Sequence, residues 1–271
     1  MSFAQVLDGQ LYYESHGLGQ PLILCAGMGG VGAYWTPQVE SFAKHFQVIV
    51  YDQRGTGRSS LSEIKYSVEL LAGDLISLMD ALQIERADVV GHSTGGMFIQ
   101  AAAVEHPNRF GSVVLYGTRA STDHFTRLAM GSRLALLRAA GPEAFHRVTP
   151  IFLYPSHWIK DHSAELEEAY LRTLAGSASV EIMASRIEAV LDHDQTARVH
   201  QIKSRVLVTC AKDDFLTPPY YSQALAGLIL GAELEFISWG GHACSQTNPS
   251  EFNDKVLSFL GVKTSLAAPS N

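Results

Sequence analysis

The chain has 271 residues, of which 46% are hydrophobic and 17% are charged, and its formal net charge is −7. This length and composition predict one large globular α/β domain with an inserted subdomain, and they argue against two unrelated domains. The acidic balance argues against nucleic acid and against anionic membranes as partners.

Two short strands are expected at the start of the chain, at 4–7 and 11–15, because Asp8-Gly9 between them is a tight hairpin signal. Later apolar runs are bounded by turn residues and are rich in Val, Ile, Leu and Tyr. Most of them lack clean alternation, as expected for strands buried on both faces of a parallel sheet. These runs lie at 21–27, 46–52, 87–92, 112–118, 205–211 and 234–240.

Helical segments lie between these runs. One is predicted by a leucine stripe at steps of four, three and four, formed by Leu71, Leu75, Leu78 and Leu82. Ser67 is a suitable N-cap for it. A nearly apolar segment at 95–107 predicts a second, deeply buried helix that Pro107 ends. Strands that alternate with helices indicate βαβ units and a mainly parallel sheet, hence an α/β fold class.

The alternation stops between about 120 and 200, where no convincing strand run occurs. Helical material is expected instead at 133–140, 142–148, 164–175 and 181–191, punctuated by Gly141-Pro142, Pro150 and Pro155. A helical insertion between two sheet strands is typical of a lid over the functional edge of the sheet. The sequence therefore predicts a core at 1–118, a helical cap at 119–200 and the second part of the core at 201–271.

One pentapeptide carries a candidate nucleophile. Gly91-His92-Ser93-Thr94-Gly95 fits G-x-S-x-G, and it lies between the strand at 87–92 and the helix that follows. That context is typical of a nucleophile elbow, in which a serine occupies a sharp strand-to-helix turn. The alternative is a serine that caps a helix in an ordinary βα turn.

A serine hydroxyl needs a base to take its proton. His242 follows the last predicted strand, and an acid at Asp213 or Asp214 follows the strand before it. All of these groups come at the carboxyl ends of predicted parallel strands, the edge where open α/β sheets bind ligands. The alternative for His242 is a loop histidine bonded to backbone. The alternative for Asp213 and Asp214 is an acidic turn before Pro218-Pro219.

Acyl transfer also needs an oxyanion hole, usually made of two backbone N–H groups. We expect one from Thr94, the residue after the nucleophile, and one from Met28 in the glycine-rich loop at 26–35. Such a loop can also hold phosphate. However, neither a G-x-G-x-x-G in strand–helix context nor a P-loop lysine motif occurs, which argues against nucleotide binding.

The three cysteines, Cys25, Cys210 and Cys244, lack metal-type spacing, so a disulfide framework or a zinc site is not expected. No signal peptide is recognised at the start of the chain, and no uncharged apolar run approaches membrane-spanning length. A cytoplasmic protein is therefore the expectation.

Together these segments resemble the α/β-hydrolase family over essentially the whole chain: "AGMGG", "YDQRGTGRSS", "GHSTGG", a helical cap, "CAKDDFLTPP" and "GGHA". The resemblance implies an eight-stranded sheet with the cap inserted after strand 6. It also favours Asp214 over Asp213 as the acid of the triad. The family's usual His-Gly before the oxyanion loop reads Ala26-Gly27 here.

Within this family, "YDQRGTG", "IFLYPSHW" and "GGHACSQTNPSEFN" are similar to the RutD-type aminoacrylate or carbamate hydrolases. The 3-oxoadipate enol-lactonases share much of the same outline. The resemblance implies hydrolysis of an ester, lactone, amide or carbamate-type bond of a small molecule. We expect this reaction to need no metal or organic cofactor, and we expect the protein to be a monomer or homodimer. Ser93 is then the nucleophile, His242 the base and Asp214 its partner.

The cap is expected to set specificity, and aromatic residues at 34, 35, 154 and 158 are candidates for the substrate pocket: Tyr34, Trp35, Tyr154 and Trp158. Packing between cap and core is the alternative for each of them. Cap arginines at 127, 133, 138 and 147 are candidates to hold a substrate carboxylate.

Two other functions stay open at this point. One is a ligand-binding signalling module of the same fold with vestigial hydrolysis. The other is cofactor-free C–C hydrolysis or perhydrolysis on the same triad, because a fold does not fix its substrate.

Overall fold

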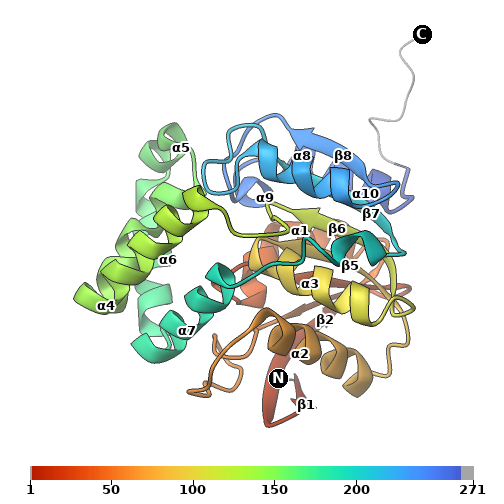
Figure 1. Cartoon of the computed structure of the whole chain (residues 1–271), viewed down its shortest axis with the longest axis horizontal. Coiled ribbons are helices and arrows are strands. Elements are labelled where there is room, and N and C mark those ends of the chain that lie inside the picture. The colour runs from red at the N-terminus through yellow and green to blue at the C-terminus, as the bar shows by residue number, and fades with distance from the viewer. Residues whose placement is uncertain (1, 264–271) are drawn as a thin grey trace.

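The computed structural model describes residues 2–263, and its centre is an eight-stranded sheet of order β1-β2-β4-β3-β5-β6-β7-β8 (Figure 1). The strands are β1 (Ser2–Val6), β2 (Gly9–His16), β3 (Pro21–Cys25), β4 (Gln47–Tyr51), β5 (Ala87–His92), β6 (Phe110–Tyr116), β7 (Arg205–Ala211) and β8 (Glu233–Ile237). Strand β2 pairs antiparallel with β1 and β4, and the pairs from β4 to β8 are all parallel. The predicted mainly parallel sheet is confirmed.

Helices cover both faces of this sheet, so consecutive strand residues enter different cores. Ile23 packs on the side of α2, α3 and α8, whereas Leu24 packs on the side of α1 and α10. The helices of the core are α1 (Thr36–Phe42), α2 (Val68–Ala81), α3 (Thr94–Glu105), α8 (Pro219–Leu228), α9 (Cys244–Thr247) and α10 (Pro249–Phe259), with short 3₁₀ turns at Gly32–Trp35 and Val199–Gln201. Burial on both faces explains the continuous apolar runs of the central strands.

Helix α2 forms where the leucine stripe predicts it. Leu71, Leu75 and Leu78 are buried in the core, and the Ser67 side chain accepts a hydrogen bond from the Leu70 amide at 3.1 Å. The N-cap satisfies one of the amides that the first helical turn leaves without a partner.

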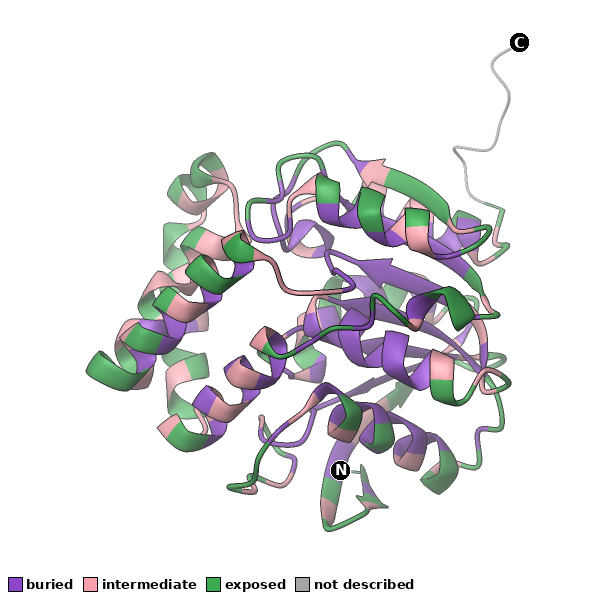
Figure 2. Ribbon diagram, in the orientation of Figure 1, coloured by how far each residue is buried: buried purple, intermediate pink, exposed green. Residues whose placement is uncertain are grey.

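The segment between β6 and β7 contains α4 (His124–Leu153), α5 (Ser156–Asp161), α6 (Ser163–Ala175) and α7 (Val180–Leu191). These helices lie together on one side of the molecule (Figure 1). An isolated bridge between Ser121 and Asp194 joins the two ends of the insertion. Figure 2 shows that the cap helices are only partly buried, in contrast to the sheet and α3.

The predicted break at Gly141-Pro142 is present in the first half of the cap, because α4 consists of two helical parts on either side of a residue that is not helical. Gly141 lies at the kink with φ 76° and ψ −176°, a backbone conformation that side chains disfavour. Pro142 begins the second half, where its missing N–H costs no helical hydrogen bond. The helix also continues past Pro150 to Leu153.

The structure also bears on the cysteines and on the possibility of a membrane-spanning helix. The three cysteines are buried and free. Among residues 2–263, no helix has the length and apolar character needed to cross a membrane.

Candidate active site

Ser93 lies in a strained turn between β5 and α3. Its φ of 53° and ψ of −116° are unusual for a residue with a side chain, and such strain concentrates at functional sites. The positions two residues before and two residues after Ser93 have no room for a side chain. A Cβ at Gly91 would lie 2.7 Å from the Gly95 carbonyl carbon, and a Cβ at Gly95 would clash with the Cys25 carbonyl oxygen. The pentapeptide therefore permits the close crossing that exposes the serine at the end of the strand.

His242 and Asp214 are in direct contact. His242 Nδ1 lies 3.0 Å from Asp214 Oδ2 and 3.2 Å from Oδ1, and both residues are buried. Asp214 Oδ1 also accepts from the Leu216 and Thr217 amides at 2.9 and 2.8 Å, and the Thr217 hydroxyl donates to Oδ2 at 2.8 Å. These donors hold the Asp214 carboxylate in place next to the imidazole.

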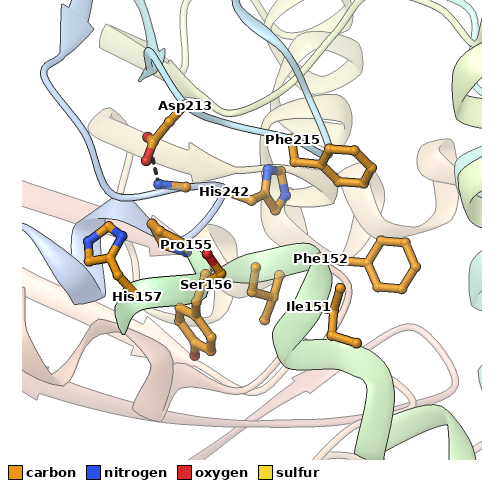
Figure 3. A pocket seen from close by; sticks show the side chains of 11 residues that line it. Ile151, Phe152, Pro155, Ser156, His157, Asp213, Phe215 and His242 are labelled. Carbon is orange, nitrogen blue, oxygen red and sulfur yellow. Dashed lines mark hydrogen bonds between the residues drawn. The ribbon is translucent and has the colours of Figure 1, made fainter. Parts of the chain in front are cut away.

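Asp213 has a different place. It is exposed, and its Oδ1 accepts from the amides of Gly240 and Gly241 at 2.8 and 2.9 Å. The dashed line in Figure 3 marks one of these contacts. Of the two neighbouring acids, Asp214 therefore contacts the ring of His242, and Asp213 holds the backbone that leads to it.

The backbone carbonyl of His242 is fixed by two groups that the sequence analysis did not assign. His92 Nε2 and the Tyr116 hydroxyl each lie 2.9 Å from this oxygen, and the rings of His92 and His242 have centroids 4.7 Å apart. Burial, and secondly the neighbouring His242, lowers the pKa of His92 well below its usual value. A neutral His92 is suited to donate from Nε2 to that carbonyl.

His92 also links His242 to Ser93, since it directly precedes Ser93 in the chain. The Ser93 amide donates to the Tyr116 carbonyl at 2.8 Å, and the Thr118 hydroxyl donates to the Ser93 carbonyl at 2.8 Å. Within residues 2–263, no hydrogen bond joins the Ser93 hydroxyl to the His242 ring. Such contacts are often long without substrate and tighten when it binds.

The loop that contains Met28 lies against Ser93. A Cβ at Gly27 would be 3.2 Å from the Ser93 Cβ, so the loop backbone passes directly beside it. Thr94 is the first residue of α3 and is buried. In the described part of the chain, neither the Met28 amide nor the Thr94 amide donates a hydrogen bond to another protein group. Both N–H groups are free to meet a ligand oxygen.

A hollow of about 340 Å³ lies between the cap and the loop of His242. Figure 3 shows the rings of Phe152 and Phe215 on one side of it and His157 on the other. Its lining consists of Ile151, Phe152, Leu153, Tyr154, Pro155, Ser156, His157, Asp213, Phe215, Gly241 and His242. The cap thus supplies most of the surface next to the imidazole.

The four aromatic pocket candidates lie in different surroundings. Tyr154 lines the hollow, and Trp158 packs on Tyr154 and stacks on His162 without lining the hollow. Tyr34 stacks on His92 with centroids 4.8 Å apart, so it supports the site from behind that ring. Trp35 does not fit the pocket prediction, because it is fully buried in the core between the sheet and α10. There its ring packs against Phe252, with ring centroids 6.3 Å apart.

The cap arginines differ in their partners. Arg138 and Arg147 form exposed ion pairs with Glu188 and Glu167, and Arg127 is exposed. Arg133 is buried against the rings of Phe145 and Phe152, and its Nη2 donates to Thr149 at 3.0 Å. Among residues 2–263 it has no carboxylate partner, and its Nε lacks a hydrogen bond. Burial lowers the pKa of Arg133 to about 10, so it is still a cation at neutral pH.

The comparison with known proteins agrees with this geometry. A family model described as the alpha/beta hydrolase fold matches residues 20–249. The chain belongs to this family. It is a hydrolase with the family's fold, and the predicted fold class and family resemblance are confirmed.

Curated relatives cover nearly the whole chain. A protein of Azorhizobium caulinodans named as a carbamate hydrolase, RutD, is 40% identical over 261 residues, with 96% of this chain and 98% of the relative covered. A RutD of Caulobacter vibrioides with the same naming is 38% identical over 260 residues, covering 94% of this chain and 96% of the relative.

Solved structures show the same outline. The enol-lactonase from Burkholderia xenovorans superimposes with a TM-score of 0.89 at 27% identity, covering 96% of this chain and all of the other. A hydrolase from Pseudomonas aeruginosa superimposes with a TM-score of 0.88 at 28% identity, covering 96% and 98%.

Proposed function

We propose that this hydrolase cleaves an acyl C–N or C–O bond of a small molecule through a covalent acyl-enzyme on Ser93, with a carbamate-type bond as the preferred class. The observation that carries the proposal is the buried contact between His242 Nδ1 and Asp214, at the strand edge that also bears the strained Ser93. The carbamate preference rests on the naming of relatives that are 38–40% identical.

In the first half of the reaction, Ser93 Oγ attacks the carbonyl carbon and its proton passes to His242 Nε2. Asp214 holds the ring with Nδ1 protonated and stabilises the imidazolium that forms. The amides of Met28 and Thr94 donate to the developing oxyanion. The imidazolium then gives its proton to the leaving alcohol or amine, and the carbonyl re-forms as an ester of Ser93.

In the second half, His242 takes a proton from water, and the hydroxide attacks the Ser93 ester. The second tetrahedral intermediate collapses, Ser93 recovers its proton from His242, and the acid is released. All steps use groups of this chain and one water molecule, so atoms and protons balance without an oxidant or reductant.

A substrate panel tests the class of bond. We expect Ser93-dependent hydrolysis of a small carbamate ester with a kcat/KM above those of a matched acetate ester and a matched δ-lactone. Steady-state kinetics with each compound measures the three kcat/KM values. Product analysis by NMR, extended to a β-diketone and to acetate plus hydrogen peroxide, identifies which bonds are cleaved or formed. Preferred cleavage of the β-diketone, or peracid as the main product, would refute hydrolysis of a C–N or C–O bond as the function.

Arg133 is the candidate for an anionic group of the substrate, because it is a buried cation without an acidic partner in the described residues and packs on Phe152, which lines the hollow. The change Arg133→Met is expected to raise KM for mono-p-nitrophenyl succinate by about 10-fold or more, since a hydrogen bond to a charged group is worth about 1.5–3 kcal/mol. KM for neutral p-nitrophenyl acetate should stay within about twofold. Steady-state kinetics checks both, and Arg127→Met is the exposed control. Equal KM changes for the two esters would contradict this role.

A further inference from the structure

Arg186 on cap helix α7 reaches the core beside the nucleophile. The residue is buried, and its Nη2 donates to the Met28 carbonyl at 3.2 Å and to Gln53 Oε1 at 2.7 Å. Its Nη1 donates to the Arg54 carbonyl at 2.6 Å. A single cap side chain therefore binds the backbone of the loop at 26–30 and the turn that follows β4.

Gln53 continues this contact to the same loop. Its Nε2 donates to the Ala26 carbonyl at 2.6 Å, and its backbone amide donates to the Gly30 carbonyl at 2.7 Å. The loop in turn lies beside Ser93 through Gly27. An unbroken series of contacts thus runs from α7 through Arg186 and Gln53 to the backbone next to the nucleophile.

The chemistry of Arg186 fits a role in positioning. In the described residues it forms no ion pair with a carboxylate, and its partners are two carbonyls and one amide oxygen. A planar guanidinium has several donors in fixed directions, so it can bind such acceptors together, whereas a lysine ammonium is a compact point charge. A buried cation without an acid is costly, so Arg186 is expected to have a function beyond packing.

We propose that Arg186 is a positioning residue that, together with Gln53, fixes the Met28 loop, so that the oxyanion hole is complete only when the cap is docked. This inference rests on the proposed function, because it assigns the Met28 amide to the oxyanion. It predicts that the cap contributes to the rate of bond cleavage as well as to substrate choice. It also places this contribution in a residue that does not touch the substrate.

The test uses the full chain with the change Arg186→Lys, which keeps the charge and loses the guanidinium. Active sites are counted by mass spectrometry after labelling with a fluorophosphonate. We expect kcat per labelled site with p-nitrophenyl acetate to fall about 10- to 100-fold with KM within about threefold, because a displaced oxyanion donor acts mainly in the transition state. The inhibition constant of phenylboronic acid, whose adduct carries an oxygen in the oxyanion hole, should rise by a similar factor.

Arg138→Met is the matched control. It removes another cap arginine, on α4, whose exposed ion pair is with Glu188 on α7, the helix that bears Arg186. It should leave kcat per site and the boronic acid constant unchanged within about twofold. If Arg186→Lys folds and leaves kcat per site and the boronic acid constant unchanged, the inference is refuted. Loss of packing alone would lower only the melting temperature and the number of active sites.

If Arg186→Lys does not fold, Gln53→Glu carries the test. A glutamate retains an acceptor for Arg186 and loses the donor to the Ala26 carbonyl, so we expect a cap that stays docked and the same fall in kcat per site. Unchanged kcat per site in that variant overturns the inference. A Ser93→Ala protein assayed alongside separates the two hypotheses, because its retained activity would refute the proposed function itself.

Discussion

Replacing Ser93 with alanine is expected to lower kcat for p-nitrophenyl acetate by at least about 10,000-fold, because no covalent intermediate can form without the hydroxyl. The fold should persist. Alanine removes one oxygen from a half-buried side chain, and the backbone contacts of Ser93 with Tyr116 and Thr118 do not involve that oxygen. Stopped-flow release of p-nitrophenol and circular dichroism on the same samples measure the two effects.

The control for this experiment is Ser132→Ala, which makes the same chemical change at an exposed position of α4. It should show the wild-type rate. If Ser93→Ala retained more than about a tenth of the wild-type kcat, direct attack by water or by another residue would replace the acyl-enzyme mechanism.

Changing Asp214 to asparagine is expected to lower kcat by about 1,000- to 10,000-fold. An asparagine amide can donate to Nδ1, which favours the imidazole tautomer that cannot take the serine proton, and it cannot stabilise the imidazolium. The packing should survive, since the remaining oxygen can still accept from the amides of Leu216 and Thr217. Single-turnover kinetics with p-nitrophenyl acetate reports on the acylation step directly.

The neighbouring acid is the matched control. Asp213→Asn keeps the oxygen that accepts from Gly240 and Gly241, so kcat should change by less than about fivefold. The opposite ranking, with the larger loss at Asp213, would mean that Asp213 rather than Asp214 partners the imidazole during the reaction.

These residues can be predicted from the sequence because each one follows a parallel strand. Ser93, Asp214 and His242 come after β5, β7 and β8, and the carboxyl ends of parallel strands meet at one edge. From the residues alone the choice between Asp213 and Asp214 stays open, since adjacent residues in a turn point in different directions. The structure shows that the backbone after β7 turns Asp214 onto His242 Nδ1 and Asp213 onto the amides of Gly240 and Gly241.

Other parts of the site have no local signal. His92 and Tyr116 act on a carbonyl more than 120 residues away in the chain, and Arg186 binds a loop 158 residues away. Such contacts depend on how the cap and the strands pack, which neither periodicity nor a short motif encodes. Trp35 is a related case, because an aromatic residue beside a glycine-rich loop is equally suited to a pocket and to a core, and only the packing against Phe252 decides between them.

The most direct test of the proposed mechanism is to follow covalent labelling by a fluorophosphonate while the remaining turnover is measured. The mechanism predicts one phosphonyl group per chain, found on the peptide that contains Ser93, and a loss of p-nitrophenyl acetate hydrolysis in strict proportion to that label. Full turnover by protein that carries the label on Ser93, or inactivation with the label on a different residue, would contradict it.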